Sequence, residues 1–188
     1  MKRIVDIVIS LIALVLLSPI FCLVAFKVRK NLGSPIFFLQ ERPGKDGKLF
    51  KMIKFRSMKD AVDKEGNPLP DDQRITPFGH KLRATTLDEM PQLLNVLKGD
   101  MSLIGPRPEQ KVFVDQFEQE IPFYNYRHIV KPGITGWAQV THGYAGDADE
   151  TRVKIEHDFY YIKHISFSLD ILIVFKTIKT MLTGFGAR

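Results

Sequence analysis

Residues 7–26 read IVISLIALVLLSPIFCLVAF, a run of 20 residues without a charge near the start of the chain. Each helical residue adds 1.5 Å, so about 20 residues reach about 30 Å, the thickness of the hydrocarbon core of a bilayer. The run therefore predicts a helix embedded in a membrane. We expect this helix to be retained, because no small-x-small cleavage site follows it.

Basic residues flank the apolar run on both sides. They are Lys2, Arg3, Lys27, Arg29 and Lys30. Basic flanks favour the cytoplasmic side of a membrane. Because both flanks are basic, the charge pattern is not that of a simple single span.

The pair Ser18–Pro19 interrupts the run. Pro19 has no N–H to donate to the Val15 carbonyl, so we expect a kink, and the Ser18 hydroxyl can bond to a carbonyl one turn earlier. Two interpretations fit these residues equally well. One is a kinked helix that crosses the bilayer; the other is a re-entrant helix, broken at Ser18–Pro19, with both ends on one side.

The remaining sequence is that of a polar, globular protein. The chain has 188 residues, is 45% hydrophobic and 26% charged, and carries a net charge of +6. This length predicts one main domain, and the composition excludes disorder and a polytopic membrane protein. The excess of basic over acidic residues fits a protein that binds phosphorylated substrates or anionic lipid. No nucleic-acid-binding motif is present, so we expect no nucleic acid partner.

Local patterns in residues 31–188 predict a mixed α+β fold. Residues 35–58 predict a β-hairpin, and residues 59–81 a polar loop. A helix is expected from a capping box of Thr86 and Glu89, ending at Gly99. Because Pro91 is tolerated only near the first turn, the start of this helix can fall a residue or two later. Near the C-terminus, an apolar helix either packs in the core or lies on a membrane surface.

The candidates for chemistry are the adjacent carboxylates Asp88 and Glu89. Acidic residues are common in the first turn of a helix, so the pair alone is weak evidence. Its neighbours strengthen it, since Arg107 stands between two prolines and Lys54 and Arg56 alternate on a predicted strand. Cations around a carboxylate nucleophile are typical of phosphoryl transfer, in which Mg²⁺ is expected.

Three long motifs carry a family resemblance: FFLQERPGKDGKLFKMIKFRSM (37–58), TTLDEMPQLLNVLKGDMSLIGPRPE (85–109) and KPGITGWAQV (131–140). The chain resembles the bacterial sugar transferase family, and within it the small monotopic phosphoglycosyl transferases. The resemblance implies transfer of a phospho-sugar from a UDP-sugar to polyprenol (undecaprenyl) phosphate, with release of UMP, as the first membrane step of glycoconjugate synthesis. Larger relatives carry further membrane helices before this unit, and the chain is similar to the minimal form.

The resemblance also implies roles for particular residues. Asp88 corresponds to a nucleophile that Mg²⁺ assists and Glu89 to its partner, with Lys54 and Arg107 near the phosphates. Ser18–Pro19 corresponds to the turning point of a re-entrant anchor. We therefore favour re-entry, because a soluble UDP-sugar and a lipid phosphate meet at the cytoplasmic face.

These expectations define the organisation of the chain. Residues 1–30 form a membrane anchor, and residues 31–188 form a catalytic domain on the cytoplasmic face of a bacterial inner membrane. The partners are a UDP-sugar, polyprenol phosphate and the lipid bilayer, with uridine and sugar contacts from residues 60–80 and 131–147. The oligomeric state stays open, a homodimer included. The alternative function is a non-catalytic scaffold at the membrane surface.

Overall fold

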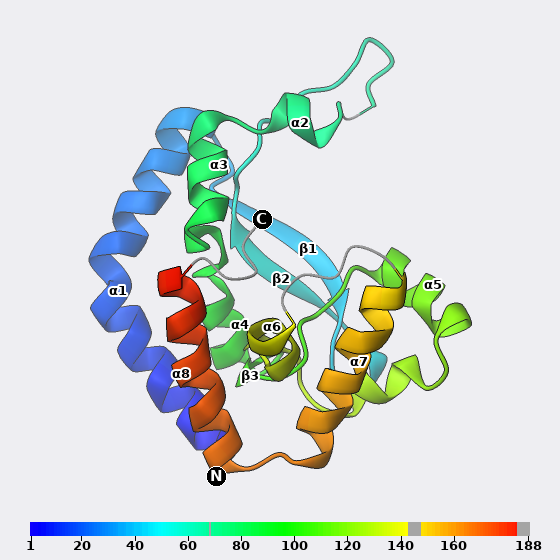
Figure 1. Cartoon of the computed structure of the whole chain (residues 1–188). Coiled ribbons are helices and arrows are strands. Elements are labelled where there is room, and N and C mark those ends of the chain that lie inside the picture. Colours follow the sequence, from blue (N-terminus) through cyan, green and yellow to red (C-terminus); the bar gives the residue numbers. More distant parts are fainter. Residues whose placement is uncertain (68, 143–147, 184–188) are drawn as a thin grey trace.

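The computed structural model describes the chain except for residues 68, 143–147 and 184–188 (Figure 1). Its longest element is α1 (Lys2–Leu32), a single helix that contains Pro19. The expected break into two arms is therefore not observed, and Figure 1 shows a bowed but continuous helix. The Ser18 hydroxyl donates to the Val15 carbonyl at 2.7 Å, which is the acceptor that Pro19 leaves without its helical donor. This hydrogen bond allows the helix to continue through the proline.

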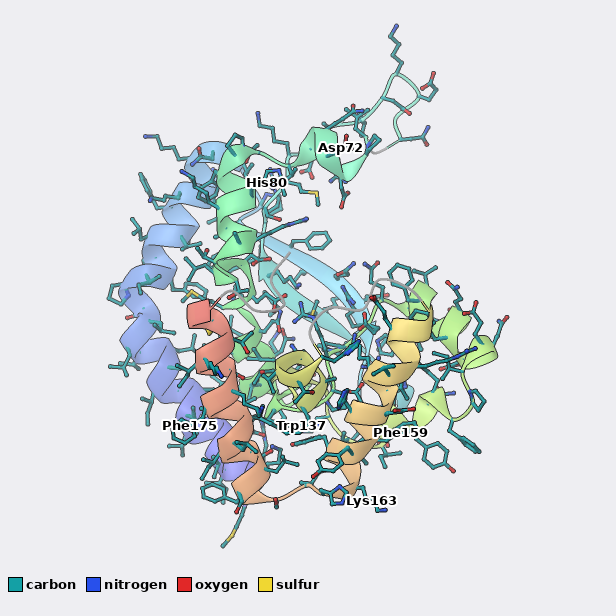
Figure 2. The ribbon with its side chains drawn as sticks, viewed as in Figure 1. Asp72, His80, Trp137, Phe159, Lys163 and Phe175 are labelled. Atoms are coloured by element: carbon teal, nitrogen blue, oxygen red, sulfur yellow. The ribbon has the colours of Figure 1, made fainter. Side chains whose placement is uncertain are left out.

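Most of α1 is exposed. The helix is long and apolar enough to cross a membrane, and only 11% of its most apolar stretch is buried. Leu16, at its middle, is 71% exposed, and Phe175 on α8 (Phe167–Thr183) is 66% exposed. Figure 2 shows side chains of α1 projecting away from the rest of the molecule. Apolar exposure of this extent indicates a membrane-associated surface.

The N-terminal end of α1 is bonded to the globular part. The Arg3 guanidinium donates to the carbonyls of Val96 and Leu97 at 2.5 and 2.9 Å. Asp6 is buried and accepts hydrogen bonds from the Ser102 hydroxyl at 2.9 Å and the Leu103 N–H at 3.1 Å. These contacts attach the start of α1, which precedes the apolar run, to residues 96–103.

The C-terminal end of α1 packs against the same globular part. Val24, Val28 and Leu32 form a core cluster with Phe55 and Leu82. Both ends of one apolar helix are thus attached to a single body, while the middle of the helix curves away from it (Figure 1). The helix ends at Leu32, two residues beyond the expected limit of the anchor.

The predicted α+β fold is confirmed. The hairpin comprises β1 (Phe37–Pro43) and β2 (Leu49–Phe55), which pair antiparallel across a 3₁₀ turn, η1 (Lys45–Gly47). A second sheet pairs β3 (Ser102–Ile104) with β4 (Gly133–Thr135) in parallel. The sheets are small, so helices supply most of the regular structure.

The other described elements are short helices and turns between the sheets, followed by longer helices. They are α2 (Asp71–Arg74), α3 (Pro77–Ala84), η2 (Leu87–Glu89), α4 (Gln92–Lys98), α5 (Lys111–Glu120), η3 (Tyr124–Ile129), α6 (Trp137–Thr141) and α7 (Ala148–Lys163). The predicted loop over residues 59–81 is wrong at its end, because α3 begins there. Thr76 caps α3 by accepting from the Gly79 N–H at 3.1 Å.

Candidate active site

Asp88 and Glu89 lie in η2, the 3₁₀ turn between α3 and α4. The predicted capping box is wrong: Thr86 has a left-handed backbone (φ 53°) and its side chain makes no capping hydrogen bond. The helix begins later, at Gln92 after Pro91, and ends as predicted at Gly99 with φ 98°. The two carboxylates therefore stand on a tight turn and not on the first turn of a helix.

Two cations from separate elements bind Glu89. The Arg107 guanidinium donates to both of its carboxylate oxygens, at 3.0 and 2.5 Å, and Lys54 on β2 donates to one of them at 2.7 Å. Burial by itself would raise the pKa of Glu89, but the charges of Arg107 and Lys54 and their hydrogen bonds hold it well below its usual range. Glu89 is consequently ionised, and its carboxylate holds the side chains of Arg107 and Lys54 in place.

Asp88 has a different environment. It is 8% exposed, and none of the described lysines or arginines forms an ion pair with it. Burial, followed by the negative charge of Glu89, raises the pKa of Asp88 to about 6, although Lys54 and Arg83 act in the opposite direction. Asp88 is thus an acid with a pKa of about 6, and no cationic side chain among the described residues forms an ion pair with its oxygens.

Close backbone packing positions the loop that carries Arg107. A Cβ on Gly133 would lie 2.1 Å from the Gly105 nitrogen, and one on Gly105 would lie 2.5 Å from the Lys131 carbonyl oxygen. Neither distance is compatible with a side chain, so the motifs GPRP and KPGITG each need glycine here. The close contact between Gly105 and Gly133 holds the end of β3 against β4. The loop that follows, with Arg107, then extends towards η2.

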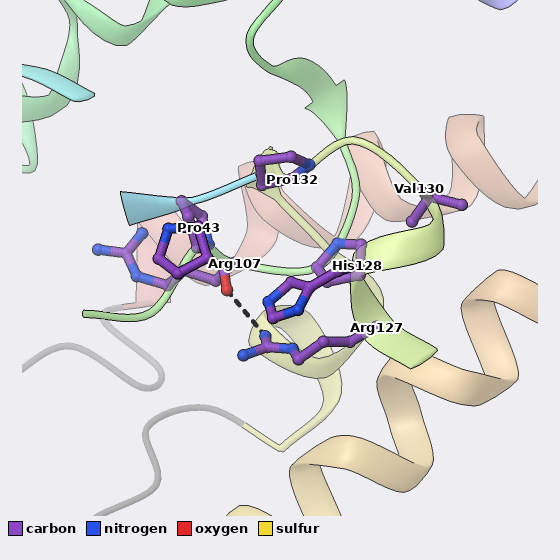
Figure 3. Close-up of a pocket in the computed structure, with 8 residues that line it drawn as sticks. Pro43, Arg107, Arg127, His128, Val130 and Pro132 are labelled. Atoms are coloured by element: carbon purple, nitrogen blue, oxygen red, sulfur yellow. Dashed lines mark hydrogen bonds between the residues drawn. The ribbon is translucent and has the colours of Figure 1, made fainter. Parts of the chain in front are cut away.

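Two arginines hold the same loop from behind. Arg42 donates to the Pro108 carbonyl at 3.0 Å, and Arg127 donates to the Arg107 carbonyl at 2.8 Å (Figure 3). The cavity beside them measures about 10 Å³, which is room for one water molecule at most. This cavity is therefore a packing feature of the loop and not a substrate site.

The side chain of Arg127 is itself fixed by a buried ion pair. It donates to Asp158 on α7 at 2.9 Å and to the Tyr124 hydroxyl at 2.8 Å, and both members of the ion pair are 2% exposed. A second contact from α7 joins Lys154 to Glu109, directly after the GPRP motif. Burial works against ionisation of Glu109, but Lys154 and then Arg127 lower its pKa to about 2. α7 thus supports the loop through two ion pairs.

Of the residues predicted for the site, Asp88, Glu89, Lys54 and Arg107 come together, and Arg56 does not join them. The Arg56 side chain is buried and donates to the Leu32 carbonyl at the end of α1, with Asp60 3.2 Å away. The expectation that Arg56 would share the strand face of Lys54 fails because β2 ends at Phe55. Arg56 instead bonds to the C-terminal end of α1.

Three arginines at or behind the site were not predicted: Arg42, Arg83 and Arg127. Arg83 on α3 acts on the charge of Asp88 and donates to the Ser57 hydroxyl at 3.0 Å. Its position five residues before Asp88 was a usable signal, because the helix C-terminus and the dyad share one short segment. Arg127 had no local signal, since its partners are distant in sequence.

The fit of Mg²⁺ depends on which oxygens are left for it. Among the residues that the structure describes, no three His, Cys, Asp or Glu side chains converge. Glu89 is occupied by two cations, so Asp88 is the carboxylate left to serve as a ligand. One carboxylate together with substrate phosphates is a common way of binding Mg²⁺. Of the expected uridine and sugar loops, residues 68 and 143–147 lie outside the described part of the chain.

The chain is similar in sequence to known proteins over nearly its whole length. A family profile described as "Bacterial sugar transferase" matches residues 1–184. A UDP-N-acetylgalactosamine-undecaprenyl-phosphate N-acetylgalactosaminephosphotransferase of Aeromonas hydrophila is 58% identical over 100% of this chain and 45% of its own length. A UDP-glucose:undecaprenyl-phosphate glucose-1-phosphate transferase of Escherichia coli is 44% identical over 95% of this chain and 39% of its own length.

The chain thus spans less than half the length of these two relatives. It spans 90% of an "uncharacterized sugar transferase EpsL" of Bacillus subtilis, which is 42% identical over 100% of this chain. The profile match over nearly all residues and this full-length similarity agree. The chain belongs to the bacterial sugar transferase family.

Proposed function

We propose that the chain transfers a phospho-sugar from a UDP-sugar to polyprenol phosphate, through a covalent intermediate on Asp88. The observation that carries the proposal is the difference between the two adjacent carboxylates. Glu89 is neutralised by Arg107 and Lys54, whereas Asp88 is buried without a cationic partner among the described residues. A carboxylate of this kind is a nucleophile held beside cations that attract phosphate.

In the first step, an Asp88 oxygen attacks the β-phosphorus of the UDP-sugar. A bond forms between Asp88 and this phosphorus, and the bond from the phosphorus to the bridging oxygen breaks. UMP leaves with that oxygen and its electron pair. Arg107 and Lys54 stabilise the charge that develops on the phosphate oxygens, since both lie at the dyad.

In the second step, a phosphate oxygen of the polyprenol phosphate attacks the phosphorus of the intermediate. The bond to Asp88 breaks, the carboxylate is restored, and a polyprenol diphosphosugar is formed. A phosphate monoester is largely ionised at neutral pH, because its second pKa is about 6. The acceptor thus needs little help from a general base.

We assign Glu89 a positioning role for this reason. Its strongly lowered pKa makes it a poor proton acceptor, and both of its oxygens are already hydrogen-bonded. Asp88 and the diphosphate would hold Mg²⁺, which supplies further charge neutralisation when it is bound.

The reaction also suggests how the chain sits in the membrane. We propose that α1 is re-entrant as a bowed helix without a break at Pro19, and that the catalytic part lies on the cytoplasmic face of a bacterial inner membrane. Arg3 bonds to α4 at one end of α1 and Val28 packs beside Phe55 near the other, so both ends adjoin one body. A span would require one end to lie across the bilayer. Cysteine labelling from outside intact cells tests this: labelling of a cysteine placed at Lys2 would contradict re-entry.

The donor is tested by UMP release from a panel of UDP-sugars, with polyprenol phosphate supplied in detergent. UDP-N-acetylgalactosamine and UDP-glucose come first, because the names of the two relatives contain N-acetylgalactosamine and glucose. Acceptor-dependent and metal-dependent UMP release from one of them supports the proposal. If no UDP-sugar in the panel yields UMP, the alternative of a non-catalytic scaffold is favoured.

A further inference from the structure

A second cavity lies away from the dyad, at the N-terminal end of α1. Its volume is about 290 Å³. Its lining is mostly apolar, with Ile104, Ile129, Val130 and Ile165, and it carries basic groups from three separate parts of the chain. These basic residues are Lys2, Arg3, Lys45 and Lys131. An apolar pocket with a few convergent charges is typical of a small-molecule site.

The charges of the cavity favour an anion. The carboxylate of Asp6 lines it too, but its oxygens already accept hydrogen bonds from Ser102 and Leu103. Lys2 is paired with Asp170 at 2.6 Å, and Arg3 bonds to backbone carbonyls. The ammonium groups of Lys45 and Lys131 form no ion pair with any described residue. Two lysines are therefore left to bind a negative ligand.

The position of the cavity sets it at the level of lipid headgroups. Lys2 and Arg3 stand just before the charge-free run of residues 7–26. Residues at such a boundary lie at the membrane–water interface. Ile129 and Ile165, at the cavity, are also exposed apolar residues. The cavity thus opens at the depth of the lipid headgroups, and exposed apolar side chains border its opening.

The cavity is distinct from the reaction site. Arg3 bonds to the last turn of α4, whereas Asp88 precedes the first. The seven residues of α4 rise about 10 Å, so a phosphate in the cavity is too distant to react with Asp88. Its ligand is therefore neither the donor diphosphate nor an acceptor phosphate in its reacting position.

We propose that this cavity binds the headgroup of an anionic phospholipid of the phosphatidylglycerol type. Lys45 and Lys131 bind the phosphate, and the apolar lining accepts the glycerol and the first carbons of the acyl chains. Because Arg3 joins the cavity wall to α4, the bound lipid also stabilises the attachment of α1 to the segment that carries the dyad.

The test measures lipid binding to the full chain, delipidated in a non-ionic detergent, by native mass spectrometry. The protein is titrated with short-chain phosphatidylglycerol, with phosphatidylcholine and with inorganic phosphate, in the absence of donor and acceptor. We expect one saturable phosphatidylglycerol site. The double variant Lys45→Ala/Lys131→Ala is expected to bind about 30-fold more weakly, since each basic residue near an anionic lipid contributes about fivefold.

Two controls separate the cavity from general surface charge. Lys59→Ala/Lys64→Ala removes the same charge from the exposed segment before α2, at the other end of the molecule from the N-terminus (Figure 1). It should bind phosphatidylglycerol like the wild type, and so should Lys45→Arg/Lys131→Arg. Equal losses in the two alanine pairs, or no loss in either, would overturn the proposal. Equally tight binding of phosphatidylcholine or of inorganic phosphate would also overturn it, because the site would then not select an anionic lipid.

Discussion

Arg107 donates one hydrogen bond to each carboxylate oxygen of Glu89, at 3.0 and 2.5 Å, across the gap between the GPRP loop and η2. The next residue in the chain, Asp88, has no such partner among the described residues. The pKa of Glu89 is consequently lowered, whereas burial and the charge of Glu89 raise that of Asp88 to about 6. Environments that separate the pKa values of two adjacent carboxylates assign them different roles.

The first prediction concerns the pH dependence of the donor reaction. Because Asp88 reacts as a carboxylate, kcat/KM should fall as the pH drops below about 6. Lys54 lowers the pKa of Asp88, so Lys54→Met should move this midpoint to higher pH. Lys51→Met removes the same charge from an exposed position of β2 and should leave it unchanged. Equal midpoints in the two variants would contradict the assignment of Asp88.

The second prediction has the opposite sign. Glu89→Gln removes a negative charge that raises the pKa of Asp88, so the midpoint of kcat/KM should move to lower pH. Activity itself should fall, since Arg107 and Lys54 lose their shared anchor. The measurement is the full pH profile of kcat/KM for the UDP-sugar, with polyprenol phosphate in excess. Loss of the acidic limb altogether would instead identify Glu89 as the titrating base.

The third prediction concerns stability. The pKa of Asp88 is about 6 in the folded chain against 3.8 for an ordinary aspartate, so ionised Asp88 destabilises the fold above about pH 6, and this cost disappears below about pH 4. Asp88→Asn should therefore raise the free energy of unfolding at pH 8 by up to about 3 kcal/mol. The gain should vanish near pH 4.

Chemical unfolding in detergent, followed at both pH values, checks this stability effect. Asp46→Asn in the exposed hairpin turn serves as the matched control and should show no gain. A destabilised Asp88→Asn at pH 8 would mean that the Asp88 carboxylate supports the fold.

The fourth prediction separates packing from positioning at the buried pair. Arg127→Met leaves Asp158 without its partner and should lower the free energy of unfolding by about 3–5 kcal/mol. The double variant Arg127→Met/Asp158→Leu should recover most of this loss. Its kcat/KM should stay low, because the Arg107 carbonyl still lacks the hydrogen bond from Arg127. Recovery of both stability and activity would show that the pair serves the fold alone.

Local sequence signals predicted much of the fold. The hairpin of residues 35–58 follows from two apolar runs around a turn, and the end of α4 follows from Gly99. The hydroxyl of Ser18 bonds where the missing donor of Pro19 required it. The predicted capping box at the start of the helix failed, because Thr86 has a left-handed backbone and α4 begins only after Pro91. Glu89 is bound by Arg107 and Lys54 instead.

The grouping of the candidate site residues in space was predicted to a similar degree. Asp88, Glu89, Lys54 and Arg107 are recognisable because each lies within an uninterrupted sequence motif, 37–58 or 85–109. Arg127 and Asp158 are 31 residues apart and meet only through η3 and α7, so no local pattern reveals them. Arg56 was wrongly expected on the strand face of Lys54, because the alternation of side chains holds only within a strand. β2 ends at Phe55, and Arg56 bonds to the Leu32 carbonyl instead.

The covalent intermediate on Asp88 is tested by a rapid-quench experiment with a UDP-sugar and no acceptor. We expect a burst of UMP that matches the enzyme concentration, with the sugar phosphate retained on the protein and released when polyprenol phosphate is added. Asp88→Asn should give no burst. Absence of the burst in a wild-type enzyme that turns over normally once the acceptor is present would rule out the covalent intermediate.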